Sequence, residues 1–426
     1  MRKLGLLLLA LAAIGSLAYA QNIDFNIMGA GARAHGMGGA FIGVSDDATA
    51  VGWNPAGIAQ LDKMEASING FFNIKKYSYE ETWIGGSYDE SNSISHFAPS
   101  FASFILPLKA ADKNLVLAVA YQRLIDFGFA DSDTGSYFDG TNTITWEREE
   151  KQTGGIDAIT PAIAFQVTPQ FSVGAAGNIL VKGSTYTSER TYSDGDFYNV
   201  EENYSYSGFN INAGALATMN KFNIGVSMRL PFTLTESAER QRTSNYLTPA
   251  TYDTTYPDFE VTMPLMFGAG IALKPTDKFT ISADFEHRSY SNSEATKKIA
   301  VYDTLTWVAT GTKDTTYNMG WHNVNQFRFG LEYILSGATA VFPVRLGFRT
   351  DPKLFTGHYG DGTDTTQAVG KVFTGGFGLV MGKVMLDLAY EYGVTNWVDI
   401  EIPANTYTEK YIEKTHNILA SCIFHF

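Results

Sequence analysis

The connections between the predicted strands of this chain alternate between short and long. From Lys63 onward, apolar and polar residues alternate with a period of two, which indicates β-strands, and about fourteen such segments follow one another. The connections after the even-numbered strands are tight, at 109–113, 168–170, 219–220, 274–277, 336–340 and Gly382. Those after the odd-numbered strands are long, at 76–97, 127–156, 183–205, 232–258, 291–323, 351–369 and 397–410. Outer-membrane barrels combine short periplasmic turns with long outer loops, so the sequence predicts an all-β fold, a 14-stranded antiparallel transmembrane β-barrel.

Residues 278–288 show the alternation most clearly, with apolar side chains at Phe279, Ile281 and Phe285 and polar side chains between them. A soluble β-sandwich also alternates. Here, however, many predicted strands reach about ten residues, the length that a bilayer-spanning strand needs, and their polar face carries charges. The predicted strands are 64–75, 98–107, 114–126, 157–167, 170–182, 206–218, 221–231, 259–273, 278–290, 324–334, 341–350, 370–381, 383–396 and 411–426.

Residues 1–20 have the pattern of a secretory signal peptide. The chain starts with a basic Met1-Arg2-Lys3, continues with an apolar run and reaches small residues at Ala18 and Ala20. The apolar run is shorter than the ~20 residues of a membrane-spanning helix. We therefore expect a location in the bacterial outer membrane, which the strands cross many times. Both termini are expected in the periplasm and the long loops outside the cell.

Residues 21–62 lie between the signal peptide and the first strand, and they lack strong period-two alternation. The stretch 28–58 is too rich in Gly and Ala to build a core of its own, because glycine loses much backbone entropy on folding. A fourteen-stranded barrel is too wide for its own side chains to fill, since about eight strands reach that limit. We therefore expect residues 21–62 to form a plug inside a barrel of residues 63–426. A flexible periplasmic tail is the alternative, but 40–44 is more apolar than such a tail would be.

Charged residues of both signs fall on the predicted inner face of the barrel. Mixed signs favour pairing across the lumen and fastening of a plug, because a buried charge needs a partner. Asp46 and Asp47 are the matching candidates in the plug: they either pair with arginines of the wall or cap a short helix that begins near Ala48. The predicted inner charges are Arg229, Asp284, Glu286, Arg288, Arg328, Glu332, Arg345, Arg349, Asp387 and Glu391.

The plug sequence resembles the N-terminal hatch of the FadL/TodX family of outer-membrane transporters for hydrophobic compounds. The Asn-Pro-Ala element and the Asp-Asp-Ala element upstream of it are the most specific features, and the remaining barrel is similar in strand count and loop order alone. The residues that carry the resemblance are Gly31-Ala32-Arg33-Ala34, Gly36-Met37-Gly38-Gly39-Ala40-Phe41, Asp46-Asp47-Ala48 and Trp53-Asn54-Pro55-Ala56-Gly57.

This resemblance implies a monomeric barrel for passive uptake of long-chain fatty acids or aromatic hydrocarbons. The ligand would bind an outer groove, built in the family where 183–205 and 232–258 lie here, pass to an inner apolar pocket and leave sideways through the wall. The hatch would be the gate, with Gly36, Gly38 and Gly39 as hinges and Asn54-Pro55-Ala56 as its tip. No ligand-pocket residue can be carried over from the family.

The Gly-Met-Gly-Gly-Ala version of the hatch also resembles FadL-like barrels of the type IX secretion apparatus, which act through protein partners. The alternative function is therefore that of a secretion-accessory barrel. Co-purification with a large secretion complex would distinguish it from the transporter.

Other classes of function find little support in the sequence. The net charge of −13 opposes nucleic acid as a partner. No G-x-S-x-G or H-E-x-x-H motif occurs, so we expect neither an enzyme nor a metal site, and no cofactor. Gly29–Ala34 matches a relaxed dinucleotide fingerprint, but it follows a signal peptide instead of a strand. The expected partners are a hydrophobic small molecule and the lipid and lipopolysaccharide of the outer membrane.

Overall fold

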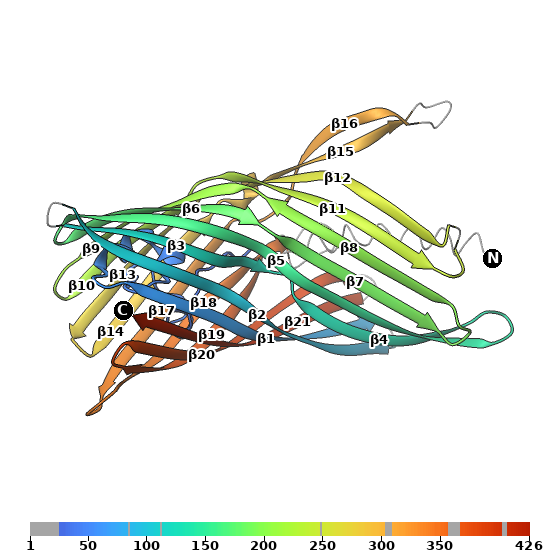
Figure 1. The fold of residues 1–426 in the computed structure, drawn as a ribbon. Helices are drawn as coiled ribbons and strands as arrows, with labels where there is room; N and C mark the ends of the chain where they lie inside the picture. Colours follow the sequence, from blue (N-terminus) through green and yellow to red (C-terminus); the bar gives the residue numbers. More distant parts are fainter. Residues whose placement is uncertain are drawn as a thin grey trace.

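A computed structural model describes residues 25–83, 86–110, 113–247, 249–302, 309–356, 367–402 and 407–426. The predicted signal peptide lies outside these residues. Fourteen strands close into one antiparallel barrel, because the first of them pairs with the last, from Glu65 opposite His425 to Thr82 opposite Thr408 (Figure 1). The predicted fold class is confirmed.

The barrel strands follow one another around the wall in chain order. Thirteen of the fourteen predicted strands lie within or close to one of them, whereas the predicted strand 259–273 merges two strands, Thr251–Met263 and Met266–Thr276. The barrel strands are β1 (Glu65–Trp83), β2 (Gly86–Ala110), β3 (Lys113–Asp126), β5 (Thr143–Thr168), β6 (Phe171–Val181), β9 (Phe209–Thr218), β10 (Phe222–Arg229), β13 (Met266–Thr276), β14 (Phe279–Arg288), β17 (Val324–Ser336), β18 (Val341–Thr356), β19 (Gln367–Met381), β20 (Val384–Ile402) and β21 (Tyr407–His425).

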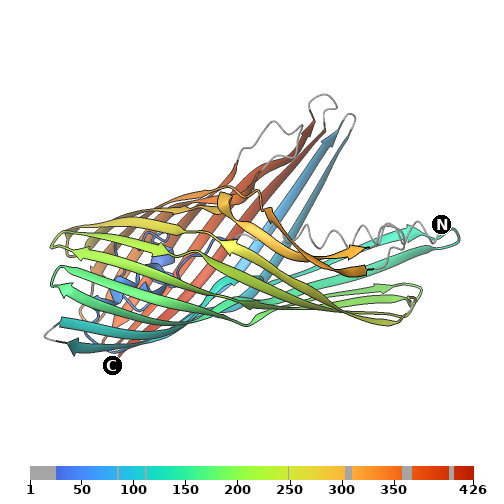
Figure 2. The same cartoon turned by 90° about the horizontal axis from the view of Figure 1, so that it is seen from above.

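The long connections contain strands that the sequence did not predict. Most of their described residues form strands that continue the wall far beyond the barrel, as Figure 2 shows. One outer sheet runs β4-β5-β7-β8-β11-β12-β15-β16, and the long β1–β2 and β20–β21 hairpins form a second extension. The added strands are β4 (Phe129–Phe138), β7 (Gly183–Tyr192), β8 (Phe197–Ser207), β11 (Phe232–Ser244), β12 (Thr251–Met263), β15 (Glu294–Tyr302) and β16 (Ala309–Asn318).

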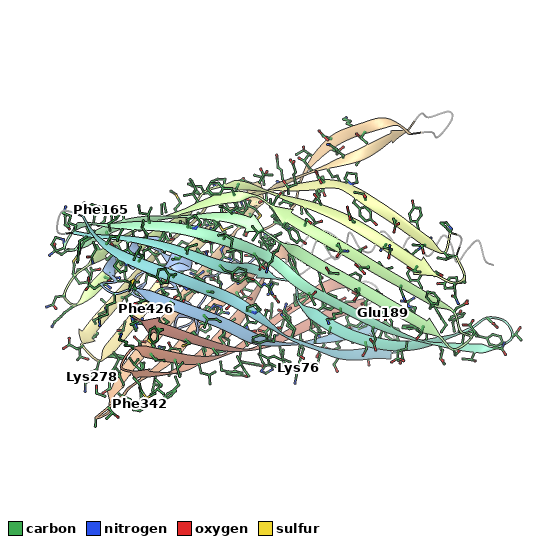
Figure 3. All side chains as sticks on the ribbon, viewed as in Figure 1. Lys76, Phe165, Glu189, Lys278, Phe342 and Phe426 are labelled. Carbon is green, nitrogen blue, oxygen red and sulfur yellow. The ribbon has the colours of Figure 1, made fainter. Side chains whose placement is uncertain are left out.

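A band of exposed apolar side chains surrounds the barrel. Alternation along each strand turns one set of residues outward, where lipid is the only favourable contact for them. Figure 3 shows side chains projecting from the wall, with Phe165, Phe342 and Phe426 near its short-turn end. Each barrel strand contributes at least one member, for example Ile68, Phe104, Val119, Ile163, Val173, Ile211, Val226, Ile271, Ile281, Phe329, Leu346, Phe373, Leu388 and Phe424. Among the described residues, no helix is long and apolar enough to span a membrane.

Residues 25–62, the described part of the predicted plug, are mostly buried inside the barrel, and we call them the hatch. They contain the short helices α2 (Ala32–Gly36) and α3 (Ala50–Trp53) and the 3₁₀ helix η2 (Pro55–Gln60). One further 3₁₀ turn, η3 (Tyr290–Asn292), lies between β14 and β15.

The two ends of the described chain lie at opposite ends of the barrel. The Phe426 N–H donates to the carbonyl oxygen of Met64 (3.0 Å) beside the start of β1. Phe25 instead packs against Trp321, with ring centroids 5.3 Å apart, where the long hairpins leave the barrel. The start of the described chain therefore differs from our expectation that both termini lie at the short turns.

Candidate functional site

The hatch is shaped by side chains that replace missing helical hydrogen bonds. Asp47 Oδ1 accepts from the backbone N–H (2.9 Å) and the hydroxyl (2.5 Å) of Thr49, just before α3. Asn54 Oδ1 accepts from the Ala56 N–H (3.2 Å), and Pro55, which has no N–H to satisfy, starts η2. Asn54 Nδ2 also donates to the Ala215 carbonyl (3.1 Å) and so joins the Asn-Pro-Ala element to the wall. Asp47 thus orders the turn before α3, whose N-cap residue is Thr49 and which has no side-chain capping bond.

Glycines of the wall let the hatch backbone lie directly on the strands. A Cβ on Gly347 would stand 2.1 Å from the Gly38 nitrogen, and one on Gly36 would stand 3.2 Å from the Gly376 Cα. Gly38 (φ +67°) and Gly39 (φ +78°) also need a backbone conformation that L-residues rarely adopt. The named glycines of the hatch therefore sit in close contact with the wall. Other wall glycines with such contacts are Gly174, Gly214, Gly225, Gly270 and Gly330.

Arg33 is the central cation of the hatch. It bonds Asp46 (2.5 Å) and Asp47 (3.3 Å) within the hatch and Glu332 of β17 through two nitrogens (3.0 and 2.9 Å). Our expectation that the Asp46-Asp47 pair meets arginines of the wall is wrong, because Arg33 is nearer in the chain and takes that position. The wall contribution is the carboxylate of Glu332.

The wall carries a chain of paired charges behind Glu332. Arg345 of β18 donates to Glu332 of β17 (2.6 Å) and to Asp387 of β20 (2.5 Å), so it lies between two carboxylates. Neither Arg345 nor Asp387 has a hydrogen bond to the hatch among the described contacts. They hold Glu332 in place, which in turn holds Arg33.

A second fastening joins α2 to β20. His35 Nδ1 lies 2.8 Å from Glu391 Oε1, and Glu391 also accepts from Arg349 at 2.5 and 3.1 Å. His35 Nε2 lies 3.0 Å from the carbonyl oxygen of Gly29. The carboxylate of Glu391 thus joins the wall to the hatch.

Asp284 holds the middle of the hatch. Its Oδ2 accepts from the backbone N–H groups of Phe41 (2.7 Å) and Ile42 (2.8 Å). Both donors belong to buried residues. Asp284 is therefore a direct tether between β14 and the segment that follows Gly38 and Gly39.

Replacing Asp284 by alanine should loosen this segment. The buried Ile42 N–H would lose its one described acceptor, at a cost of about 1–3 kcal/mol, whereas the Phe41 N–H would keep a second acceptor in the Gly39 carbonyl (2.9 Å). The amide of Ile42 should therefore exchange hydrogen faster, as measured by mass spectrometry. Asp284→Asn, which keeps an acceptor oxygen, is the control and should show most of the native protection. Equal exchange in both variants would contradict the tether.

The remaining inner charges form a network beside Trp53. Glu286 pairs with Arg288 (2.6 Å) and Arg328 (2.7 Å). Arg288 donates to Asn26 Oδ1 (2.6 Å), and the Arg328 guanidinium lies 5.4 Å above the Trp53 ring. Arg229 differs from this group: it donates to Asn212 Oδ1 (2.9 Å) and to Met266 Sδ (3.8 Å), both on the wall.

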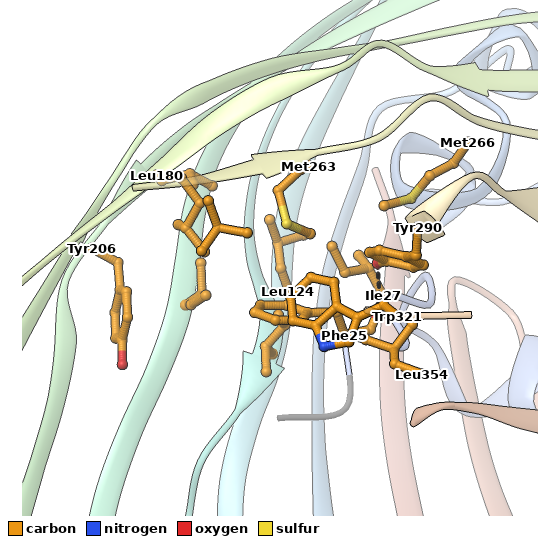
Figure 4. Packing of buried hydrophobic residues seen from close by; sticks show 14 of the residues in the cluster. Phe25, Ile27, Leu124, Leu180, Tyr206, Met263, Met266, Tyr290, Trp321 and Leu354 are labelled. Atoms are coloured by element: carbon orange, nitrogen blue, oxygen red, sulfur yellow. Dashed lines mark hydrogen bonds between the residues drawn. The ribbon is translucent and has the colours of Figure 1, made fainter. Parts of the chain in front are cut away.

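An apolar cluster closes the outer end of the lumen. Phe25 lies at its centre, where the Tyr290 hydroxyl donates to the Phe25 carbonyl (2.8 Å) and the Trp321 ring packs against both aromatic rings (Figure 4). The open space left is about 20 Å³, little more than one water needs. The space is lined by Phe25, Phe127, Ile156, Tyr206, Leu234, Glu236, Phe259, Val261, Met319 and Trp321.

This cluster uses other outer segments than those expected. Leu234 and Glu236 come from 232–258, but no residue of 183–205 lines the space. The space is lined instead by Phe127, which follows β3, by Ile156 of β5, and by Met319 and Trp321, which precede β17.

A larger cavity of about 240 Å³ lies between the hatch and β1–β3. Beside this cavity, β2 and β3 separate and leave a notch in the wall. The two strands pair up to Phe101 opposite Gln122, and beyond that point β2 pairs with β1 alone and β3 pairs with β5 alone. His96 of β2 bonds to Asp126 across this notch. The neighbouring Phe97 is 71% exposed, so the notch lies at the level of the apolar band.

Sequence reasoning assigned no roles to Arg33, His35 and the wall glycines. Arg33 and His35 are the only basic side chains in 28–58, which is a usable signal in a segment with two adjacent acids. A glycine such as Gly347 at an inward strand position was a weaker signal, because glycine in strands also marks bulges. Among the described residues, no group of three or more His, Cys, Asp or Glu could hold a metal ion.

A plugged fourteen-stranded barrel agrees with the sequence family that matches most of this chain. The family model is described as outer membrane protein transport protein (OMPP1/FadL/TodX), and it matches residues 9–355. The chain belongs to the FadL/TodX family. Its members are outer-membrane transporters of hydrophobic compounds. A search of curated protein sequences finds no match.

Solved structures of FadL/TodX proteins have the same fold. A FadL homologue of Pseudomonas aeruginosa is 12% identical, with a TM-score of 0.61 over 95% of this chain and 100% of that one. The P. putida toluene transporter TodX is 11% identical (TM-score 0.58, 94% and 99% covered). The Ralstonia pickettii toluene transporter TbuX is 14% identical (TM-score 0.53, 94% and 100% covered). At these identities, the likeness concerns the fold.

Proposed function

We propose that this FadL/TodX protein takes up hydrophobic small molecules, in the class of long-chain fatty acids or aromatic hydrocarbons, by diffusion across the outer membrane. A ligand binds among the outer hairpins, enters the lumen past Phe25, passes the cavity beside the hatch and leaves sideways into lipid. The observation that carries this proposal is the notch between β2 and β3, which lies beside a hatch cavity and at the level of the apolar band.

The physical need favours a dry, lateral route over an aqueous pore. An apolar solute gains about 25 cal/mol for each Å² that it removes from water, which a water-filled pore does not provide. The hatch is fastened on several sides, so a local rearrangement is a more economical gate than its expulsion. Phe25 and the His96–Asp126 contact stand at the two ends of the route, where a ligand must displace a side chain.

Uptake measurements test the transport function. Deletion of the gene should lower uptake of radiolabelled oleate or toluene, and native mass spectrometry of the purified protein should detect a retained apolar ligand. Unchanged uptake of both compounds together with an empty protein would remove the proposal. Co-purification with a large secretion complex would favour the secretion-accessory alternative instead.

Binding at the outer cluster should depend on pH through Glu236. Burial, together with the nearby Glu202 carboxylate, raises the pKa of Glu236, although a hydrogen bond from Tyr206 acts in the opposite direction. A ligand that displaces Phe25 would occupy more than the 20 Å³ now open, bury Glu236 further and favour its neutral form. The affinity should therefore be highest below this pKa and should fall as the pH rises through it. The fall should reach up to about tenfold for each pH unit by which ligand binding raises the pKa of Glu236.

Naphthalene, which has no titratable group, is a suitable probe between about pH 5 and about pH 8. The variant Glu236→Gln should bind it with little dependence on pH. Glu239→Gln is the matched control, because Glu239 is exposed on the same strand, and it should retain the native dependence. A native protein with constant affinity over this range would contradict the role of Glu236.

A further inference from the structure

Two hydrogen-bond acceptors without a partner line the 240 Å³ cavity. Asn73 of β1 and His96 of β2 both face it. Asn73 Oδ1 and His96 Nδ1 are buried atoms, and neither has a hydrogen bond in the described structure. Asn73 is only 7% exposed. Buried polar atoms are nearly always paired, so two open acceptors on one cavity indicate the position of a missing donor.

The orientation of Asn73 follows from its neighbours. The Glu391 carboxylate can only accept, so the Asn417 group that reaches it (3.0 Å) is the amide nitrogen. Asn417 therefore presents its oxygen to Asn73, which donates through Nδ2. The atom that Asn73 leaves free is consequently its carbonyl oxygen, an acceptor. Turning either amide over would bring like groups face to face.

The orientation of His96 is fixed in the same way. Its Nε2 contacts the Asp126 carboxylate and so carries a hydrogen, and in the tautomer with one ring hydrogen the lone pair is then on Nδ1. Phe71 packs edge-on against the ring at 5.8 Å, and Gly128 makes room for it, since a Cβ there would stand 2.4 Å from His96 Cδ2. The ring is therefore held with Nδ1 as a second acceptor.

The charges around the cavity are already matched. His35 lies against Glu391, and Arg123 bonds Asp157 (2.8 Å) and Asp126 (3.0 Å). Lys75 has an interaction of its own as well. No cation among these described residues remains for an anionic ligand, and burying an unpaired carboxylate is costly. The cavity thus disfavours an ionised carboxylate, so of the two proposed substrate classes it favours the uncharged one.

The rest of the lining is apolar, with Met28, Phe71, Leu124 and Leu419. We propose that this cavity binds a neutral hydrophobic molecule that carries a hydrogen-bond donor, such as a phenol or an alcohol. Its hydroxyl donates to Asn73 Oδ1 or His96 Nδ1, and its hydrocarbon part contacts the apolar side chains. The cavity is at the small end of ligand sites, which suits one or two rings. The role of this site in uptake rests on the proposed transport function. Binding of the ligand at the site does not depend on that function.

Three naphthalene derivatives of similar size separate the chemistry. 2-Naphthol has a donor, 2-methoxynaphthalene has none, and 2-naphthoate is an anion. With the full-length protein in lipid nanodiscs, and empty nanodiscs as the blank, 2-naphthol should bind about tenfold more tightly than the methyl ether, the effect of one hydrogen bond. 2-Naphthoate should bind most weakly. Equal binding of 2-naphthol and the ether, or displacement of 2-naphthol by the anion, would overturn the proposal.

Variants assign the effect to the cavity. Asn73→Leu and His96→Phe each remove one acceptor, and at least one of them should lower the preference for 2-naphthol to about twofold or less. The use of two variants protects the test against a folding defect in one of them. The folding of each variant is checked by the change in its gel migration on heating. Asn203→Leu, on the exposed face of the outer sheet, is the control and should keep the preference. If neither cavity variant changes it, the site is elsewhere.

The outcomes also separate this site from transport. A tenfold preference in nanodiscs with unchanged uptake in the deletion strain would retain the site and remove the transport function. Protein-dependent uptake of toluene without any preference for 2-naphthol would retain transport and remove the site.

Discussion

Arg345→Leu should lower the free energy of unfolding by about 3–5 kcal/mol, because it leaves two buried carboxylates without their shared cation. Arg345 is only 1% exposed and bonds Glu332 and Asp387. Glu332 would keep Arg33, but Asp387 would lose its one described ion pair. Denaturant unfolding of the protein in lipid vesicles measures the change.

Arg148→Leu is the matched control for this substitution. Arg148 also bonds two carboxylates, Asp133 (2.7 Å) and Glu150 (3.3 Å), but it lies in the outer sheet with its side chain 30% exposed. Water screens such pairs, so the cost should stay at about 0–1 kcal/mol. If the two variants lose similar stability, the inner charges are not the main fastening of the hatch.

Gly38→Val should displace the hatch and open the barrel to ions. A Cβ at Gly38 would stand 2.7 Å from the Phe329 oxygen and from the Phe348 nitrogen, and these are backbone atoms that cannot yield. Positive φ adds about 1–3 kcal/mol for a residue other than glycine. Planar-bilayer recordings should change from a closed protein to steady conductance, since a fourteen-stranded barrel without a plug is water-filled.

Gly382→Val is the control that separates the effect of backbone strain from the effect of steric overlap with the wall. Gly382 has a similar φ (+57°), but a Cβ there would have no atom within 4 Å, because the residue lies in the tight turn between β19 and β20. This variant should remain closed. If both variants conduct, the strained backbone alone explains the leak. If the native protein conducts steadily, it is a general porin.

The sequence was sufficient for the barrel because its signal is local. Alternation at 278–288 depends only on which side of a strand faces lipid, and β14 has those residues in that arrangement. The outer strands were missed for the same reason. In β7, Thr185, Thr187 and Glu189 face one way and Tyr186, Ser188 and Arg190 the other, so both faces are polar and no alternation of hydropathy results.

Partner choice inside the lumen was harder to predict. The sequence contained Asp46, Asp47 and several inner arginines, and nothing local separated Arg33 from Arg345 as the partner. Asp284 was selected as an inner charge, but its bonds to two backbone N–H groups depend on the path of the hatch. The notch between β2 and β3 depends on the residue at which the two strands stop pairing. The alternation of apolar and polar residues does not determine that position.

The pairing of β1 with β21, which closes the barrel, has a consequence for assembly. β1 and β21 come from opposite ends of the chain, and the hatch is attached directly to β1 while Phe25 lies at the far end of the lumen. A hatch left outside a finished ring would have to thread through it to reach that position. The sheet must therefore curl around its own N-terminal segment, and β21 must dock last. We expect folding to be limited by this final docking, as contacts between distant parts of a chain form slowly.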